Sequence, residues 1–102
     1  MAAQSVVYCF TITKSGVVPK LVKALVAMAV RETDLVFSAA RRKLETEVRV
    51  WARKPACAIT AGTECGEHLA RLLSGFLIKQ LGADGFVVQR RLSKRAFGMA
   101  RL

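Results

Sequence analysis

The stretch Val6–Thr13, VVYCFTIT, decides the fold because it is the clearest strand in the chain. Its residues are mainly β-branched or aromatic, which is typical of strands. Side chains alternate along a strand, so Tyr8, Phe10 and Ile12 share one face and the residues between them share the other. We predict a central strand here.

A helix is predicted after this strand. The turn Lys14-Ser15-Gly16 leads to Pro19, which suits the first helical position because its missing N–H would have no partner there. The helix should run over Pro19–Arg31, with its few polar side chains in one narrow stripe. We therefore expect burial of more than one face, either by tight packing on the sheet, which we favour, or by a second protein that covers part of the helix. The interface candidates on this helix are Leu21, Leu25 and Met28.

The segment Asp34–Lys54 fits two patterns. As strands, it comprises Leu35–Ala39 (LVFSA) and Thr46–Ala52 (TEVRVWA), whose residues alternate in polarity. As a helix, it has Asp34 as a cap, Glu45 four residues before Arg49, and an apolar stripe. We favour strands, because β-branched and aromatic residues alternate with charge just before a proline-containing turn. The stripe of the helical alternative comprises Phe37, Ala40, Leu44, Val48 and Trp51.

The second half of the chain is more clearly marked. A short apolar strand, Cys57–Thr60, precedes a helix for which Thr63 is the predicted N-cap, with Glu64 and Glu67 in the first turn. Leucines and a phenylalanine recur at helical spacing until Gly82 ends the helix. A last strand is predicted over residues 86–92.

This element order predicts an α+β fold, a ferredoxin-like βαββαβ two-layer sandwich. Its antiparallel sheet would carry two helices on one face and leave the other face free for RNA or a partner subunit. We predict one α+β domain over residues 1–92 and a basic C-terminal tail over residues 93–102.

Charge is the strongest functional signal. The chain of 102 residues has 17 Lys and Arg against 7 acids, a net charge of +10, with 53% hydrophobic residues. This composition excludes a disordered chain and a multidomain enzyme, and it favours a polyanionic partner. Eleven of the basic residues lie in residues 41–54 and 90–101. The RNA-binding candidates are Arg41, Arg42, Lys43, Arg49, Trp51, Arg53, Arg90, Arg91, Lys94 and Arg95, where the arginines and lysines would contact the backbone and Trp51 would stack.

The residues offer little for catalysis. Cys57, Cys65 and His68 form a Cys-x7-Cys-x2-His series, but a structural zinc site needs a fourth ligand. Cys65 near a helix start, with His68 one turn later, is the only pair that could supply a nucleophile. We expect no enzymatic activity, no metal, no cofactor and no small-molecule substrate.

Cysteine usage and hydropathy bear on the compartment. Three cysteines, an odd number without a secretory signal, favour free thiols inside the cell, in the cytoplasm or a mitochondrion. The longest near-apolar stretch, Leu21–Val30, is too short to span a bilayer, so we expect no membrane insertion. The end Ala100-Arg101-Leu102 resembles a peroxisomal address, which is the alternative. Whether a presequence was removed stays open.

Several features together resemble a ribosomal protein family. These are the element order, an arginine pair followed by a strand, and a last strand that runs into a basic tail. They are similar to the sixth protein of the bacterial and organellar small ribosomal subunit, over about residues 5–95. Arg41-Arg42-Lys43-Leu44 falls where that family has Arg-x-Leu, whereas Glu45-Thr46 replaces its Ala-Tyr. The resemblance implies a ferredoxin-like fold that binds ribosomal RNA beside a neighbouring small-subunit protein.

We therefore expect a non-enzymatic, RNA-binding structural component of a ribonucleoprotein, such as a mitochondrial ribosome, with neighbouring protein subunits. The alternative is a protein–protein interaction or assembly module. In that case the apolar helix 19–31 would be the interface, and the positive charge would be directed at an acidic partner.

Overall fold

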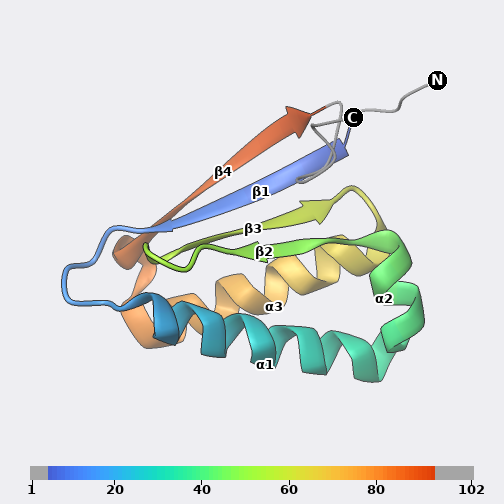
Figure 1. Ribbon diagram of the computed structural model, residues 1–102, viewed down its shortest axis with the longest axis horizontal. Coiled ribbons are helices and arrows are strands. Elements are labelled where there is room, and N and C mark those ends of the chain that lie inside the picture. The colour runs from blue at the N-terminus through green and yellow to red at the C-terminus, as the bar shows by residue number, and fades with distance from the viewer. Residues whose placement is uncertain (1–4, 94–102) are drawn as a thin grey trace.

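The computed structural model describes residues 5–93 of the chain, and these form a sheet with helices on one side (Figure 1). The sheet has four antiparallel strands in the order β2-β3-β1-β4. Residues 5–93 form an α+β fold, as predicted, but contain three α-helices rather than two. The strands are β1 (Ser5–Ile12), β2 (Val48–Val50), β3 (Ala56–Ala61) and β4 (Phe86–Ser93). The helices are α1 (Pro19–Phe37), α2 (Ala39–Glu45), α3 (Glu64–Leu81) and the short 3-10 helix η1 (Ala83–Gly85).

Strand β1 lies in the middle of the sheet, which confirms the prediction for this stretch. It pairs with β3 on one side and with β4 on the other. Opposed residues of an antiparallel pair point to the same face, so Tyr8 shares its face with Ile59 and Arg90. Helices α1 and α3 cover this face (Figure 1).

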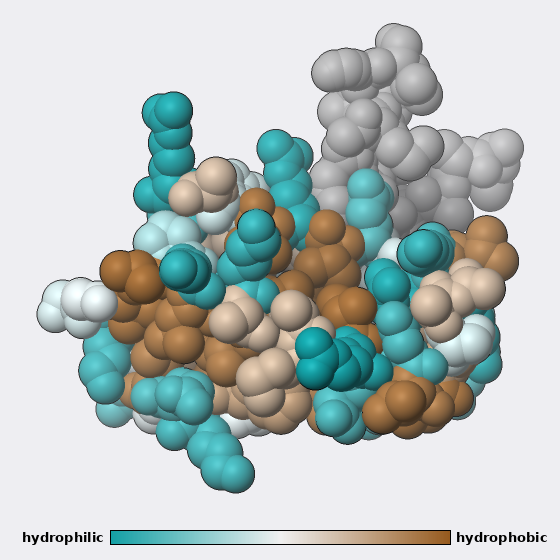
Figure 2. All heavy atoms as spheres, turned by 60° about the horizontal axis from the view of Figure 1, so that its bottom comes forward, coloured by the Kyte–Doolittle hydropathy of each residue, from teal (hydrophilic) through white to brown (hydrophobic). Residues whose placement is uncertain are grey.

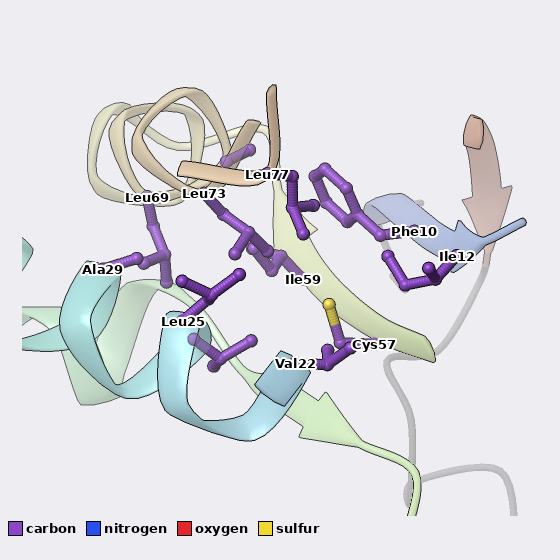
Figure 3. Close-up of a cluster of buried hydrophobic side chains, with 12 residues drawn as sticks. Phe10, Ile12, Val22, Leu25, Ala29, Cys57, Ile59, Leu69, Leu73 and Leu77 are labelled. Atoms are coloured by element: carbon purple, nitrogen blue, oxygen red, sulfur yellow. The ribbon is translucent and has the colours of Figure 1, made fainter. Parts of the chain in front are cut away.

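The core lies between this sheet face and the two long helices. Figure 3 shows side chains from α1 and α3 pointing toward those of β1 and β3. Phe10 and Ile59 from the sheet are at most 1% exposed, as are Leu69, Leu73 and Leu77 from α3. Full burial of such a side chain stabilises a fold by about 1.5–3 kcal/mol. The periodic leucines predicted on α3 therefore form the centre of the core.

Helix α1 begins at Pro19 as predicted but continues to Phe37 instead of ending at Arg31. Only one of its faces is buried, through Val22, Leu25, Val26, Ala29 and Thr33. The expectation that it buries more than one face is therefore wrong for the chain alone. Leu35 and Val36, just before the last residue of the helix, are 78% and 63% exposed.

The strand predicted over Leu35–Ala39 is wrong. Its first three residues end α1, and α2 begins at Ala39 after the single intervening residue Ser38. Ser38 separates the two helices with a positive φ of 78°, and its side chain accepts a hydrogen bond from the N–H of Arg41. An ion pair between Asp34 and Arg42 then joins α1 to α2. These contacts stabilise the helical pair.

The helical alternative for this segment is also only partly right. Asp34 lies inside α1 rather than at a cap, and Leu44 of the predicted stripe is 87% exposed. Glu45 pairs with Arg41, four residues before it, rather than with Arg49 after it. The strand predicted over Thr46–Ala52 exists, but its regular part is limited to Val48–Val50.

Helix α3 begins and ends where its sequence signals place it. Thr63 is the N-cap, and its side chain accepts a hydrogen bond of 3.0 Å from the N–H of Gly66. Glu64 and Glu67 lie in the first turn, where the helix dipole favours acids. Gly82, with a φ of 82°, follows the last turn.

Within residues 5–93, no helix combines the length and the apolarity that crossing a membrane requires. The predicted RNA-binding residues Lys94 and Arg95, and the tripeptide Ala100-Arg101-Leu102, lie outside the described residues. So does the predicted basic tail, apart from Ser93.

Candidate nucleic-acid interface

Within residues 5–93, no helix covers the sheet face turned away from α1 and α3, which we call the open face. One row of side chains crosses it from edge to edge, because Arg49 of β2 opposes Ala58, Ala58 opposes Cys9, and Cys9 opposes Gln89 of β4. The central side chains of this row are small, whereas those at the edges are long and polar. The open face therefore has a low floor between two higher edges.

Trp51 follows β2 at one edge of this face and contacts two cations. The guanidinium of Arg49 and the ammonium of Lys54 each lie 5.4 Å from a ring centroid of Trp51, within cation–π range. Trp51 and Lys54 also line a shallow hollow of about 170 Å³ on the open face. Arg91 of β4 lines the opposite side of the same hollow, above a floor that includes Cys9, Thr11 and Ala56.

A second hollow places two lysines of α1 beside Trp51. It measures about 300 Å³ and is lined by Trp51, Lys20 and Lys23 together with three uncharged neighbours. Among the described residues that line these two hollows, none is acidic. We call Trp51 with its five cations the Trp51 surface. Those cations are Lys20, Lys23, Arg49, Lys54 and Arg91.

Sequence reasoning did not select Lys20, Lys23 or Lys54 as binding residues. Lys20 and Lys23 lie about thirty residues from Trp51 in the chain and reach it only because α1 starts beside the end of β2. No pattern of neighbouring residues in the sequence predicts such a long-range contact. Lys54 did belong to the basic cluster before Pro55, and its position three residues after the only tryptophan was the one usable sign.

The arginine pair on α2 is engaged by acids instead. Arg41 lies 2.6 Å from Glu45 and 3.1 Å from Glu64, and its hydrogen bonds to these carboxylates raise the pKa of its guanidinium. Arg42 pairs with Asp34 and is half-buried. Lys43 on the same helix is exposed, and so is Arg53 in the turn after β2. The positive charges of Arg41 and Arg42 are therefore less available to a phosphate than those of Arg49 and Arg91.

The two arginines of β4 point to opposite faces. Arg91 opposes Val7 on the open face, whereas Arg90 opposes Tyr8 on the helix-covered face. Strands β2 and β4 form the two edges of the sheet, so their basic clusters do not meet by strand pairing. They approach one another across the open face, through Arg91 on one side and the residues around Trp51 on the other.

The three interface candidates of α1 lie in different environments. Leu25 belongs to the core and is 4% exposed, Leu21 is half-buried, and Met28 is 46% exposed. Met28 borders a hollow of about 310 Å³ between α1 and α3, whose other lining includes Phe76 and Lys79. Apolar surface is visible between hydrophilic side chains on the helix side of the molecule (Figure 2).

Cys9 and Cys57 line the open-face hollow beside Lys54 and Arg91, whereas Cys65 and His68 do not. Burial, with a smaller contribution from Cys9, raises the pKa of the Cys57 thiol to about 12. Burial also raises the pKa of Cys65, which is fully buried. His68 packs edge-on against Phe37 with ring centroids 5.3 Å apart. In the part of the chain that the structure describes, no three His, Cys, Asp or Glu side chains gather as a metal site would require.

Comparison with known proteins identifies no relative: no family model, no curated protein and no solved structure matches this chain.

Proposed function

We propose that this protein is a non-enzymatic, RNA-binding structural component of a ribonucleoprotein and that the Trp51 surface holds a single-stranded stretch of RNA. The observation that carries the proposal is the arrangement of Trp51 among five cations beside an open sheet face. Proteins that bind single strands combine a positively charged groove with an aromatic side chain on which a base stacks.

Each group of the Trp51 surface has a part in this proposal. One base stacks on the ring of Trp51 and takes the place of Arg49 or Lys54 there. The side chains of Arg49 and Lys54 are exposed and can turn toward phosphates. Arg91 takes a phosphate at the far side of the hollow. The small floor of Cys9 and Ala56 lets the strand lie close to the sheet. Because these contacts are with phosphates and one base face, binding depends little on sequence.

We further propose that the fold is ferredoxin-like and that the particle is a ribosome, such as a mitochondrial one. Two features support the fold assignment: the strand order β2-β3-β1-β4, and the two long helices on one face. Helix α2 is an addition to the two-helix plan. The net charge of +10 supports a partner rich in phosphate.

The first test uses the only tryptophan of the chain as its own reporter. Addition of a ten-nucleotide uridine RNA to the full chain should change the fluorescence of Trp51. Trp51→Ala should weaken binding about tenfold or more, because stacking on an aromatic ring contributes about 1–3 kcal/mol per base. RNA that binds without changing the fluorescence of Trp51 would contradict the assignment of this surface.

Two arginine variants give a matched control. Arg91→Ala should weaken binding of the same RNA, whereas Arg71→Ala, which removes the same charge from the hollow between α3 and β4 on the helix-covered side, should change it little. Equal loss in the two variants would mean that only net charge matters. Melting temperatures of both variants should be measured beside the affinities.

The alternative function has one observation in its favour, the hollow beside Met28 between α1 and α3. In this alternative, the protein would be an assembly module that binds a partner protein on the side of the sheet covered by α1 and α3. Sedimentation of the tagged protein from its own cells, with and without ribonuclease, separates the two functions. A large particle that collapses on RNA digestion supports RNA binding, whereas a light complex that survives digestion supports the assembly module.

A further inference from the structure

Strand β4 forms a free edge of the sheet. It has eight residues and, within residues 5–93, pairs only with β1. The N–H of Ile12 donates to Pro55, so the backbone of Ile12 faces β3 and that of Thr11 faces its partner Val87 on β4. Backbone groups alternate in direction along an antiparallel ladder. Those of Val88 and Arg90 therefore point outward, where another strand could bind them.

A groove runs along this edge on the helix side of the sheet. It lies between β4 and α3, measures about 570 Å³, and has Val88 and Ile78 in its walls. These two side chains are 41% and 49% exposed. A Cβ atom added at Gly75, which also lines the groove, would meet nothing within 4 Å. A strand added beside β4 would turn every second side chain toward this apolar space.

The charge along the edge is positive on both faces. Arg90 lies on the groove side, Arg91 on the open side, and Arg71 in the groove lining. The acid that lines the groove, Glu67, already accepts hydrogen bonds from the hydroxyl of Tyr8 at 3.1 Å and from the N–H of Gly62 at 3.3 Å. The ion pairs of the described residues involve only Arg41 and Arg42, so the three arginines at this edge keep their charge available.

We propose that the free edge of β4 binds an extended, acidic segment of a partner protein as a fifth strand. Main-chain hydrogen bonds to Val88 and Arg90 supply affinity, as in other cases of strand addition. Carboxylates opposite Arg91 on the open side select the partner, and the apolar side chains that alternate with them enter the groove. The same arginines disfavour a second copy of this chain, which would bring like charges to the edge.

The test uses the full chain and two blocked ten-residue peptides, one alternating Glu and Val, the other alternating Lys and Val. Fluorescence anisotropy at low salt should show the Glu/Val peptide binding at least tenfold more tightly than the Lys/Val peptide. Equal affinity for the two peptides would overturn the charge selection on which the proposal rests.

Variants locate the peptide on the edge. Val88→Pro removes an outward N–H and should leave the β1–β4 ladder intact, so it should weaken Glu/Val binding at least tenfold. Arg91→Ala should also weaken it, whereas Lys79→Ala, with the same change of charge on the far side of α3, should not. Unchanged affinity in a folded Val88→Pro variant would overturn the proposal.

Two further measurements keep the result decisive. If Val88→Pro does not fold, amide hydrogen exchange of the unmodified protein replaces it: the amides of Val88 and Arg90 should become protected when the peptide is added, and unchanged protection would overturn the proposal. Trp51→Ala should retain peptide binding, so loss of RNA binding and loss of peptide binding are separate outcomes. Self-association that is abolished by Val88→Pro would assign the edge to a second copy instead.

Discussion

Gly66 and Gly75 lie on the same helix in opposite surroundings. A Cβ atom at Gly66 would lie 2.7 Å from the carbonyl oxygen of Thr60 and 2.8 Å from the Cα of Ala61, so α3 can approach the end of β3 this closely only with glycine there. At Gly75 the same atom would meet nothing within 4 Å. The first glycine is required by packing and the second is not.

This contrast predicts opposite effects of one substitution. Gly66→Ala should lower the free energy of unfolding by about 1–3 kcal/mol, because backbone atoms must shift to admit the methyl group. Gly75→Ala should raise it by about 0.5–1 kcal/mol, because alanine favours the helix. Urea unfolding of the two variants measures both changes. A Gly66→Ala variant as stable as the unmodified protein would contradict the close approach of α3 to β3.

The three thiols should differ in reactivity. Cys57 and Cys65 are buried with raised pKa values, whereas Cys9 is half-buried on the open face. Because the thiolate is the reactive form, one thiol should react rapidly with a chromogenic disulfide at pH 8, and Cys9→Ser should remove that fast phase. Two fast thiols in the folded protein would contradict the burial of Cys57 or Cys65.

The pKa of Cys57 also predicts how stability depends on pH. Its value of about 12 in the folded protein lies above its ordinary value of 9.0, so the unfolded chain loses this proton first as pH rises. The stabilisation is therefore complete below about pH 9 and declines as pH rises toward 12. Cys57→Ala should show a shallower decline in unfolding free energy above pH 9 than the unmodified protein.

At the scale of elements, the junction of α1 and α2 depends on Ser38. Its φ of 78° lies in the region that favours glycine, and its side chain caps α2 through the N–H of Arg41. Loss of a serine cap costs about 1 kcal/mol when alanine replaces it but only a few tenths when glycine does. The positive φ itself costs a residue with a side chain about 1–3 kcal/mol.

We therefore expect the protein to be most stable with glycine at position 38, less stable with serine and least stable with alanine. Ser38→Gly should raise the melting temperature because it removes the backbone strain, and Ser38→Ala should lower it because it removes the cap and keeps the strain. Each kcal/mol corresponds to about 4–8 °C for a domain of this size. An alanine variant more stable than the glycine variant would contradict the conformation of this junction.

At the scale of the whole molecule, the cations are divided between structural and available groups. Arg41 and Arg42 stabilise the α1–α2 junction and the contact with α3, whereas the Trp51 surface gathers five cations, with no acid among the described residues that line its hollows. Salt dependence distinguishes these two groups, because each phosphate contact on single-stranded RNA adds about −0.7 to the slope of log affinity against log salt.

A triple variant gives the measurable consequence. Replacement of Arg49, Lys54 and Arg91 by alanine should reduce the magnitude of the salt slope for the uridine RNA by about 2. Replacement of Arg31, Arg71 and Lys79, which are exposed on α1 and α3, should change the slope little, although the net charge falls equally. Equal reduction by both triple variants would show diffuse attraction rather than binding at the Trp51 surface.

Elements whose signals are local could be predicted from the sequence. The strand at Val6–Thr13, the helix between Thr63 and Gly82 and the strand over residues 86–92 all occur within about one residue of their predicted ends. These elements are marked by the period of their side chains, by a capping threonine and by a terminal glycine. Such signals involve only neighbouring residues, so they can be recognised before the fold is known. The sequence likewise established the excess of positive charge.

Only the tertiary structure decided the conformation of residues 35–47 and the composition of the candidate site. Leu35, Val36 and Leu44 are apolar yet exposed, so the pattern they form does not mark a buried face. Whether a cation is available depends on acids distant in sequence, as for Arg41 with Glu64, and on which elements become neighbours, as for Lys20 and Trp51. These are long-range contacts, and a local pattern cannot specify them.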